Sequence, residues 1–189
     1  MGKIVVRAMT AEDLHVHMMD EFDRHQEITR IVRKNGRVQK LRKPRVEDWA
    51  AGFTKGSISN FIYHVYFRQY FGGEPKVFAA FRGNQVVGFA HWRFMEDLKL
   101  KRSKQTTFAI LDRLFVSQEC RRMGLGRQLF DLCAGAARAE GAKMLYISTN
   151  PSVETQAFYR SLGCVKSKVD LGPVMRAAKW DIPLEYSLT

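Results

Sequence analysis

The sequence predicts a single mixed α/β domain over residues 1–189. The chain is long enough for one sizeable core, because a domain of this size buries roughly 70% of the surface that its extended chain exposes. Hydrophobic residues make up 46% of the chain and charged residues 26%, which excludes a disordered chain, a collagen-like fibre and a small disulfide scaffold. Short β-prone runs alternate with stretches of helical periodicity, without repeats, low-complexity tracts or linkers.

The first two elements expected are a strand and a helix. Residues 4–7 form a short β-prone run. Thr10 fits a helix N-cap, and Asp13 fits the acidic position of a capping box. Apolar residues then recur at helical spacing, which predicts a helix over residues 10–23.

A β-hairpin is expected next. Two β-prone runs, residues 28–32 and 37–41, flank Asn35 and Gly36, a pair typical of two-residue hairpin turns. Pro44 is expected to end the hairpin, because proline cannot donate a ladder hydrogen bond.

The middle of the chain predicts a helix and a second hairpin. Residues 47–70 have a helical pattern that glycines interrupt. Residues 77–81 and 85–94 are β-prone and flank a second hairpin turn, Gly83-Asn84.

The C-terminal half predicts alternating strands and helices. An apolar stripe predicts the first helix, and Asn150 followed by proline marks the start of the second. Residues 142–148 are apolar on both faces, as in a buried parallel strand. The expected strands are residues 106–116, 142–148, 165–169 and 182–188, and the expected helices are residues 124–140 and 150–162.

The positive charge is concentrated in two windows. Lys and Arg number 31 and Asp and Glu number 19, so the formal net charge is +12. Residues 30–45 contain eight basic residues and no acidic one, and four more basic residues lie between 99 and 104 in a loop expected at residues 95–104. Such patches are typical of anion binding, and a nucleic acid, an acidic lipid, an acidic substrate or a phosphorylated cofactor would all fit.

Membrane and disulfide-rich classes are disfavoured. No apolar run approaches the ~18 residues that span a bilayer, and the N-terminal residues fit neither a secretion signal nor a myristoylation signal. We therefore expect no membrane association and a cytoplasmic location. Cys120, Cys133 and Cys164 are expected to be free thiols, because an odd number at wide spacing fits neither a disulfide framework nor a zinc site. We expect no metal.

A glycine-containing turn carries the clearest chemical signal. The strand expected at residues 106–116 leads to Gly124 and Gly126 at the start of a helix. The first amides of a helix lack intrahelical acceptors, the helix dipole adds positive charge, and glycines let an anion approach the backbone. These features predict a phosphate or pyrophosphate site, although a helix start among solvated arginines is the simpler alternative. Three arginines surround the turn: Arg121, Arg122 and Arg127.

Two motifs together resemble the GNAT superfamily of N-acetyltransferases. The Arg-x-x-Gly-x-Gly pattern at residues 121–126, after the strand end Leu-Phe-Val at 114–116, is similar to the coenzyme A pyrophosphate motif of that family. Asn150 and the Phe-Tyr-x-x-x-Gly pattern at residues 158–163 are similar to its later helix. The resemblance implies one GNAT domain, with a mixed, mostly antiparallel sheet that is splayed where acetyl-CoA binds.

The resemblance also implies how the co-substrate binds. Backbone groups at the end of one splayed strand would pair with the pantetheine arm, and the following loop would hold the pyrophosphate. A fixed donor on the thioester carbonyl would stabilise the oxyanion, and a primary amine would attack directly in a ternary complex. The cofactor-binding residues implied are Leu114, Phe115, Val116, Arg121, Arg122, Met123, Gly124, Leu125, Gly126, Arg127 and Asn150.

Tyr159 is implied as the general acid that protonates the leaving thiolate. The alternative is a core tyrosine on the apolar face of a helix. Asn150 would contact the cofactor, act as a helix N-cap, or do both.

The general base is less determined. Asp112 shares a strand face with Leu114 and would either face the acceptor or pair with Arg113 or another basic residue. A base that acts through water would leave no mark in the sequence. The lesser candidates are Glu96, His91 and His25.

The acceptor and a second function depend on the basic hairpin, which we interpret as an insertion at about residues 24–46. As a lid over the acceptor site it would favour an anionic amine, and as a solvated surface it would have no such role. A binding module for nucleic acid or an acidic partner, using residues 30–45, is the alternative function. The scarcity of aromatic residues in that window disfavours stacking on bases. Whether the chain forms a homodimer is left open.

Overall fold

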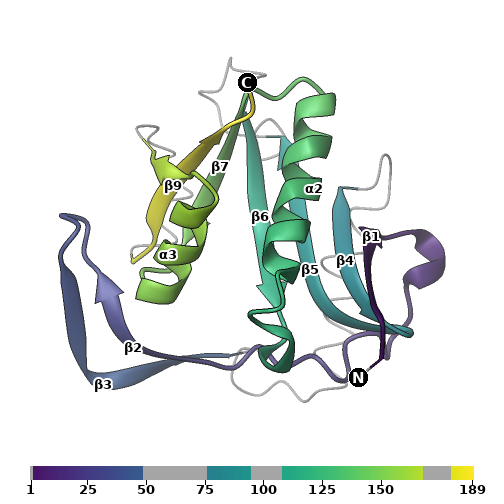
Figure 1. Ribbon diagram of the computed structural model, residues 1–189, viewed down its shortest axis with the longest axis horizontal. Helices are drawn as coiled ribbons and strands as arrows, with labels where there is room; N and C mark the ends of the chain where they lie inside the picture. Colours follow the sequence, from purple (N-terminus) through teal and green to yellow (C-terminus); the bar gives the residue numbers. More distant parts are fainter. Residues whose placement is uncertain (1, 49–75, 95–107, 168–179) are drawn as a thin grey trace. The chain divides into compact units, whose positions relative to one another are not determined.

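The computed structural model describes residues 2–48, 76–94, 108–167 and 180–189 (Figure 1). The strands are β1 Ile4–Ala8, β2 Gln26–Val32, β3 Val38–Glu47, β4 Val77–Arg82, β5 Gln85–Phe94, β6 Phe108–Val116, β7 Met144–Thr149, β8 Val165–Lys166 and β9 Ile182–Ser187. The helices are α2 Leu125–Ala139, α3 Val153–Ser161 and two 3-10 helices, η1 Ala11–Asp13 and η5 Gln118–Cys120.

The strands form a mixed, mostly antiparallel sheet. Seven of them follow the order β1-β4-β5-β6-β7-β9-β8, and β2 and β3 form a separate two-stranded sheet. The pair β6-β7 is parallel, whereas β1-β4, β4-β5, β7-β9 and β8-β9 are antiparallel. This arrangement confirms the mixed α/β class that the sequence predicts.

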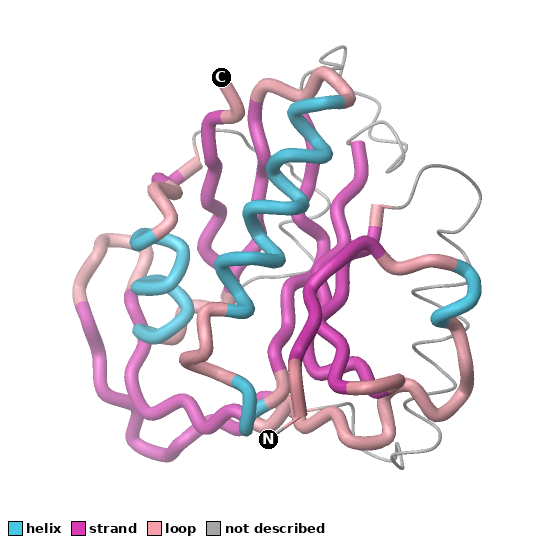
Figure 2. The backbone as a smooth tube through the Cα atoms, turned by 45° about the vertical axis from the view of Figure 1, so that its right-hand side comes forward, coloured by secondary structure: helices cyan, strands magenta, loops and turns pink. Residues whose placement is uncertain are grey.

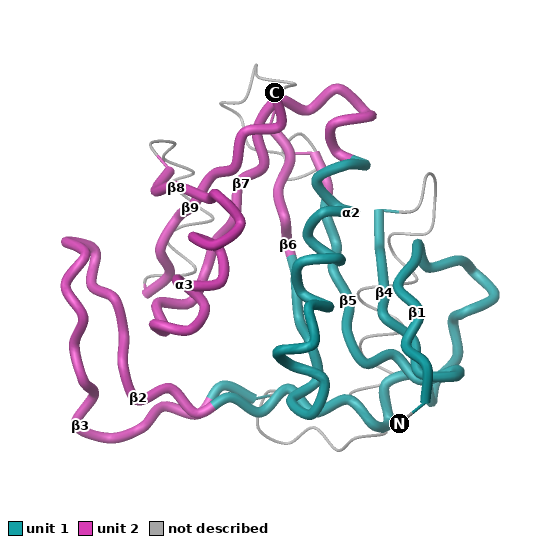
Figure 3. The backbone as a smooth tube through the Cα atoms, in the orientation of Figure 1, with its two compact units in different colours: residues 1–26, 47–92, 113–136 teal, residues 27–46, 93–112, 137–189 magenta. Residues whose placement is uncertain are grey.

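The chain divides into two compact units (Figure 3). Unit 1 comprises residues 1–26, 47–92 and 113–136, and unit 2 comprises residues 27–46, 93–112 and 137–189. β6 and α2 each contribute residues to both units.

The core of unit 1 lies on β4 and β5. The Gly83-Asn84 turn joins them as predicted, because Gly83 adopts the left-handed φ of +60° that this turn requires. One cluster of buried residues is Met9, Met18, Met19, Phe22, Val77, Ala79, Phe81, Val86 and Phe89, and a second is Ala80, Val87, Cys120 and Leu125. The second cluster fixes the start of α2 against these strands, since Leu125 is the first residue of that helix.

The helix expected over residues 10–23 is wrong beyond its first turn. Thr10 N donates to Asp13 Oδ2 at 2.8 Å, so the capping box is confirmed, but the helix ends at Asp13 (Figure 2). Four-residue β-turns follow, and the Met18 carbonyl accepts from Val86 N at 2.7 Å. A helical carbonyl would instead accept from a residue four positions later, so pairing with β5 replaces the helix.

Unit 2 is built around β7. Its pairing with β6 runs from Phe108↔Met144 to Leu111↔Ile147. Its pairing with β9 runs from Met144↔Ser187 to Thr149↔Ile182. Leu145, Tyr146 and Ile147 are almost fully buried, which confirms the parallel buried strand that their apolar run predicts.

The β2-β3 hairpin is confirmed, with one correction. Gly36 has a φ of +83°, as its turn position requires. β3 does not end at Pro44 but continues to Glu47. β3 is exposed along most of its length, and proline is tolerated on such a strand where its missing N–H faces away from the ladder.

Three sequence predictions lie largely outside the described residues. They are the helix over residues 47–70 beyond residue 48, the loop at residues 95–104, and the end of the strand at residues 165–169.

Candidate functional site

The turn between β6 and α2 is held to the core at its start and open further on. Ser117 is fully buried, and its N–H donates to the Val87 carbonyl at 2.9 Å. Arg122 and Gly124 have positive φ values of 67° and 81°. A Cβ on Gly124 would meet nothing closer than Gln128 Nε2 at 4.0 Å, so the backbone conformation, rather than space, requires glycine there.

This turn presents polar backbone and positive charge to solvent. Arg122, Met123, Gly124 and Arg127 are exposed, whereas Leu125 is buried in the core. The first turn of α2 has no acidic residue. Its free amides and the positive end of its dipole can therefore hold an anion without a competing carboxylate in that turn.

Glu119 is the acidic residue of the turn, and neighbouring groups compensate its charge. Ser117 Oγ donates to Glu119 Oε2 at 2.6 Å, and Arg82 Nη2 lies 3.8 Å from Glu119 Oε1. Burial raises the pKa of Glu119. Its hydrogen bonds and the charge of Arg82 together lower the pKa by more than burial raises it, so the pKa lies below its usual range. The Glu119 carboxylate therefore has its hydrogen-bond donor and its cationic partner within the protein itself.

The side chain of Arg121 binds the protein backbone. Its Nε donates to the Val116 carbonyl at 3.1 Å, and its Nη2 donates to the Arg24 carbonyl at 3.0 Å. Burial lowers the pKa of Arg121, while Asp23 and Glu119 act in the opposite direction. Arg121 therefore shapes the turn, and neither the sequence motif nor the charge pattern indicated its partners.

The end of β6 extends beyond its pairing with β7. Pairing with β7 stops at Leu111↔Ile147, whereas β6 continues to Val116. Leu114, Phe115 and Val116 are half-buried. The Phe115 ring packs on Phe89 with centroids 5.6 Å apart.

Asn150 lies at the junction of β7 and α3 in unit 2. Its Oδ1 accepts from Ser152 N at 3.0 Å, and Ser152 Oγ accepts from Thr155 N at 3.1 Å. Ser152 is thus the N-cap of α3, and the N-cap role considered for Asn150 is wrong. The buried side chain of Gln156, which the sequence did not indicate, donates to the Asn150 carbonyl at 2.9 Å and to Thr149 Oγ1 at 2.7 Å.

Tyr159 lies on the buried face of α3 and is 7% exposed. Its ring meets Phe158 edge-on, with centroids 5.0 Å apart. Its carbonyl accepts from Leu162 N and from Cys164 N, which together with Gly163 at a φ of +94° ends the helix. Asn150 and Tyr159 therefore come from one β7-α3 segment.

Asp112 pairs with a basic residue, which is one of the two alternatives that the sequence left open. Arg93 Nη2 lies 3.1 Å from its Oδ1, and both side chains are largely buried. Among the lesser base candidates, His91 is buried and His25 Nδ1 lies 3.8 Å from Asp48 Oδ2. Glu96 lies outside the described residues.

The predicted site residues form two groups. Those from Leu114 to Arg127 belong to unit 1, and Asp112, Asn150 and Tyr159 belong to unit 2 (Figure 3). The first group lies on the end of β6, the turn after it and the start of α2, whereas Asp112 lies on β6 and the other two on the β7-α3 segment.

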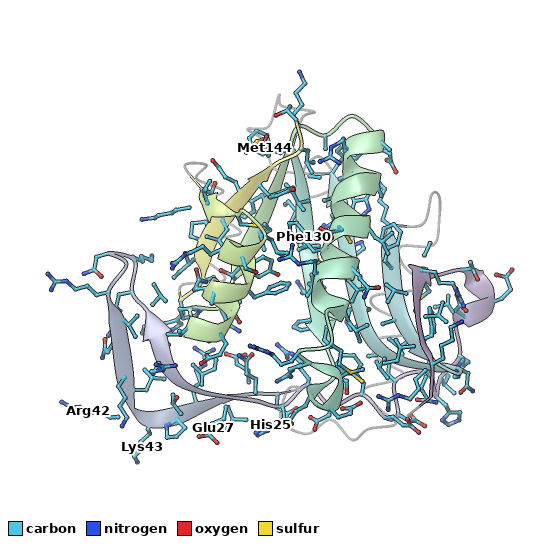
Figure 4. The ribbon with its side chains drawn as sticks, viewed as in Figure 1. His25, Glu27, Arg42, Lys43, Phe130 and Met144 are labelled. Carbon is cyan, nitrogen blue, oxygen red and sulfur yellow. The ribbon has the colours of Figure 1, made fainter. Side chains whose placement is uncertain are left out.

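The basic hairpin is anchored to the start of α3 within unit 2. Val32 N donates to the Pro151 carbonyl at 2.8 Å, and Ile31 forms an isolated bridge with Ser152. Arg30 Nη2 lies 3.8 Å from Glu154 Oε1. The basic side chains of β3 are exposed, and Figure 4 shows Arg42 and Lys43 pointing away from the strand into solvent.

The cysteines, possible metal ligands and helix lengths of the described residues relate to further sequence predictions. The three cysteines are free, as predicted, and all three are buried. Among residues 2–48, 76–94, 108–167 and 180–189, no cluster of three His, Cys, Asp or Glu side chains could hold a metal. No helix there is long and apolar enough to cross a membrane.

Several solved structures with a similar fold are named as acetyltransferases. The putative streptothricin acetyltransferase of Bacillus anthracis, in complex with acetyl coenzyme A, is 16% identical with a TM-score of 0.65, and 98% of this chain and 99% of that chain are covered. The PaiA N-acetyltransferase of Thermoplasma acidophilum, in complex with coenzyme A, is 16% identical with a TM-score of 0.56, and 98% and 99% are covered. The ribosomal-protein-S18-alanine N-acetyltransferase of Escherichia coli is 15% identical with a TM-score of 0.53, and 99% and 95% are covered.

No curated protein matches the chain significantly in sequence. The family model described as the acetyltransferase (GNAT) family matches residues 43–164, which is more than half of the chain. That span contains β6, the glycine turn, α2, β7 and α3. The chain therefore belongs to the GNAT family of acetyltransferases.

Proposed function

We propose that the protein transfers an acetyl group from acetyl-CoA to a primary amine by direct attack in a ternary complex. The observation that carries the proposal is the exposed turn between β6 and α2, with its left-handed Arg122 and Gly124 and its acid-free first helical turn. Such a turn suits the pyrophosphate of acetyl-CoA. An acetyl-CoA-dependent reaction would place the enzyme where that co-substrate is supplied, for which we propose the cytoplasm.

The co-substrate would be held in two parts. The amides of the turn and of the first turn of α2, with the side chains of Arg122 and Arg127, would bind the pyrophosphate. The backbone of residues 114–116, beyond the last β6-β7 pair, would bind the pantetheine arm. The hydrogen bonds of Arg121 to the backbone support a role in shaping this segment, in addition to its backbone contribution.

Tyr159 would be the general acid. The amine nitrogen attacks the thioester carbonyl, a C–N bond forms, and the C–S bond breaks. The leaving thiolate takes the phenolic proton of Tyr159, and the proton that the attacking nitrogen loses as the amide forms restores the phenol, so the products are the amide and the coenzyme A thiol. Burial on α3 suits this role, because a site that excludes water strengthens a positioned donor.

Asp112 would be the general base that removes a proton from the ammonium acceptor, directly or through water. Its carboxylate is held by Arg93, so the alternative is that Asp112 only orients Arg93. Replacement of Asp112 by Asn distinguishes the two roles. A base would be revealed by loss of the low-pH limb of the kcat/KM profile, whereas an orienting role would lower activity without changing the profile's shape.

The acceptor would carry a carboxylate or phosphate beside its amine. The exposed cations of the β2-β3 hairpin support this, because they would attract an anion and repel a strongly cationic acceptor. The hairpin contains no aromatic residue between Gln26 and Glu47, which again disfavours stacking on nucleic acid.

Thermal unfolding with and without acetyl-CoA tests the proposal. A co-substrate at about 100 times its Kd should add roughly 2.7 kcal/mol to the free energy of unfolding, and Gly124→Glu should abolish the gain. Release of the coenzyme A thiol would then be screened across amines with and without anionic groups. An unchanged midpoint at millimolar acetyl-CoA would contradict the proposal.

A further inference from the structure

We infer that Arg24 is a positioning residue that joins the base of the cationic hairpin to the segment that binds acetyl-CoA, so that acetyl-CoA binding steadies the hairpin. The hairpin base is defined as residues 23–26 and 47–48, which enter and leave the β2-β3 sheet. The inference rests on the proposed function, since it requires that acetyl-CoA binds the end of β6 and the turn after it.

The Arg24 side chain holds three parts of unit 1 together. Its guanidinium lies over the Phe115 ring, 4.6 Å from the ring centroid. Its Nη1 donates to the Asp48 carbonyl at 2.7 Å, and its Nη2 lies 3.9 Å from Glu47 Oε2. One side chain therefore connects both ends of the hairpin with the strand end that would bind pantetheine.

The backbone at residues 23–24 is fixed by further hydrogen bonds to the turn between β6 and α2, residues 117–124. Arg121 Nη2 donates to the Arg24 carbonyl at 3.0 Å, while its Nε donates to the Val116 carbonyl. Gln118 N donates to the Asp23 carbonyl at 2.8 Å, and Asp23 N donates to Ser117 Oγ at 2.9 Å. Arg121, a residue of the family motif, thus contacts the hairpin base directly.

These contacts matter because a two-stranded sheet has little stability of its own. An isolated hairpin is marginal in water, and β3 is exposed along most of its length. The hairpin therefore depends on its anchors, which include the base described here, the bonds of Ile31 and Val32 to residues 151–152, the pair of Arg30 with Glu154, and the hydrogen bond from Lys166 Nζ to the Lys34 carbonyl. A ligand that orders residues 114–127 would also order the base through Arg24 and Arg121.

The consequence for the reaction is a coupling between the two substrates. The hairpin would hold its cations more firmly in place when the acetyl donor is bound. An anionic acceptor would then bind more tightly to the acetyl-CoA complex than to the free enzyme. Binding energies are reciprocal, so acceptor binding would tighten acetyl-CoA binding by the same factor.

Hydrogen-deuterium exchange of the full chain, with and without saturating acetyl-CoA, tests this inference. Amides within residues 27–46 should exchange about fivefold more slowly when acetyl-CoA is bound, which is the low end of typical coupling. In Arg24→Met most of the slowing should disappear, and only the part carried by the backbone hydrogen bonds of residues 23–24 should remain, although the variant still binds acetyl-CoA. Arg24→Lys keeps the charge but loses the planar fork, so it should retain less than half of the effect.

Arg7→Met is the matched control. Arg7 also lies over an aromatic ring, 4.3 Å from the centroid of Phe81, and also pairs with an acidic side chain, Asp13. Its loss should leave the acetyl-CoA-dependent slowing intact, even if it lowers stability as much as the loss of Arg24.

The outcomes separate this inference from the proposed function. If acetyl-CoA raises the unfolding midpoint of the wild type but hairpin exchange is unchanged, the coupling is wrong and the acetyl-CoA site stands. If Arg24→Met, folded by circular dichroism, retains the full slowing, the role of Arg24 is wrong. If acetyl-CoA does not bind the wild type at all, both the proposed function and the inference fail.

Discussion

Asp13 shows how one contact makes stability depend on pH. Arg7 donates two hydrogen bonds of 2.6 Å to its carboxylate, and these bonds, against opposing desolvation, lower the pKa of Asp13 from 3.8 to about 2. Because the folded-state pKa is lowered, the stabilisation is complete above about pH 4 and is lost as the pH falls through about 2.

Asp13→Asn should therefore lower the free energy of unfolding by roughly 1 kcal/mol at neutral pH, a modest loss because Arg7 is half exposed and water screens the pair. The difference from wild type should shrink below pH 4. Urea unfolding between pH 2.5 and 7 measures it, with the exposed Asp131→Asn as control. A difference that stays constant over this range would show that the ion pair does not cause the loss.

Tyr159 is the second residue whose role can be isolated. Tyr159→Phe removes the proton that the thiolate needs but keeps the buried ring, so kcat should fall by about 10² or more while the Kd for acetyl-CoA changes little. Steady-state kinetics and calorimetric binding measure the two quantities. Tyr146→Phe, at another buried tyrosine, on β7, is the matched control and should retain its kcat. Wild-type turnover in Tyr159→Phe would refute the acid role.

At the scale of single elements, the glycine before α2 serves two purposes that can be separated. It adopts a left-handed backbone conformation, and it would let acetyl-CoA approach the backbone. Gly124 and Gly141 both have left-handed φ values, 81° and 91°, in open surroundings. Replacing either with Ala should cost about 1–2 kcal/mol of stability through backbone strain, with a similar loss at the two positions. Only Gly124→Ala should weaken acetyl-CoA binding. Equal Kd values for the two variants would contradict the pyrophosphate site.

The β2-β3 hairpin is the second element with a testable role. Replacing Arg37, Lys40 and Arg42 with Ala should raise the KM of an anionic acceptor at least tenfold, since the cations that attract it are lost. The KM for acetyl-CoA should change much less. Removal of the same charge at Lys3, Lys143 and Arg160, which are exposed outside the hairpin, should not raise the acceptor KM. Unchanged acceptor KM in the hairpin variant would leave the hairpin as a solvated surface.

At the scale of the whole molecule, the cysteines report on folding. Burial raises the pKa of Cys164 to about 12 and raises those of Cys133 and Cys120 as well. At pH 8 these thiols should therefore resist a disulfide reagent such as dithionitrobenzoate in the native protein, and all three should react in denaturant. Rapid native reaction of one thiol would show that its part of the core opens without global unfolding.

The elements that could be predicted are those with strong local signals. Asn35-Gly36 and Gly83-Asn84 each require a left-handed turn, and both hairpins occur where these pairs predict them. The apolar stripe of α2 also favours one structure, which is a helix that buries this stripe. The helix predicted after Asp13 is wrong. The Met18 carbonyl accepts a hydrogen bond from an amide of β5, which is distant in sequence, instead of from an amide of its own helix.

The sequence by itself determined the fold class, the hairpins, helices α2 and α3, and the motif that led to the GNAT family, because each depends on residues close together in the chain. Only the tertiary structure decided the partners of the long polar side chains. Arg121 binds the backbone at residue 24, Asp112 pairs with Arg93, and Gln156 holds the carbonyl of Asn150. Arginine and carboxylate groups can reach many partners, and which one they meet depends on strands that are distant in sequence and adjacent only after folding.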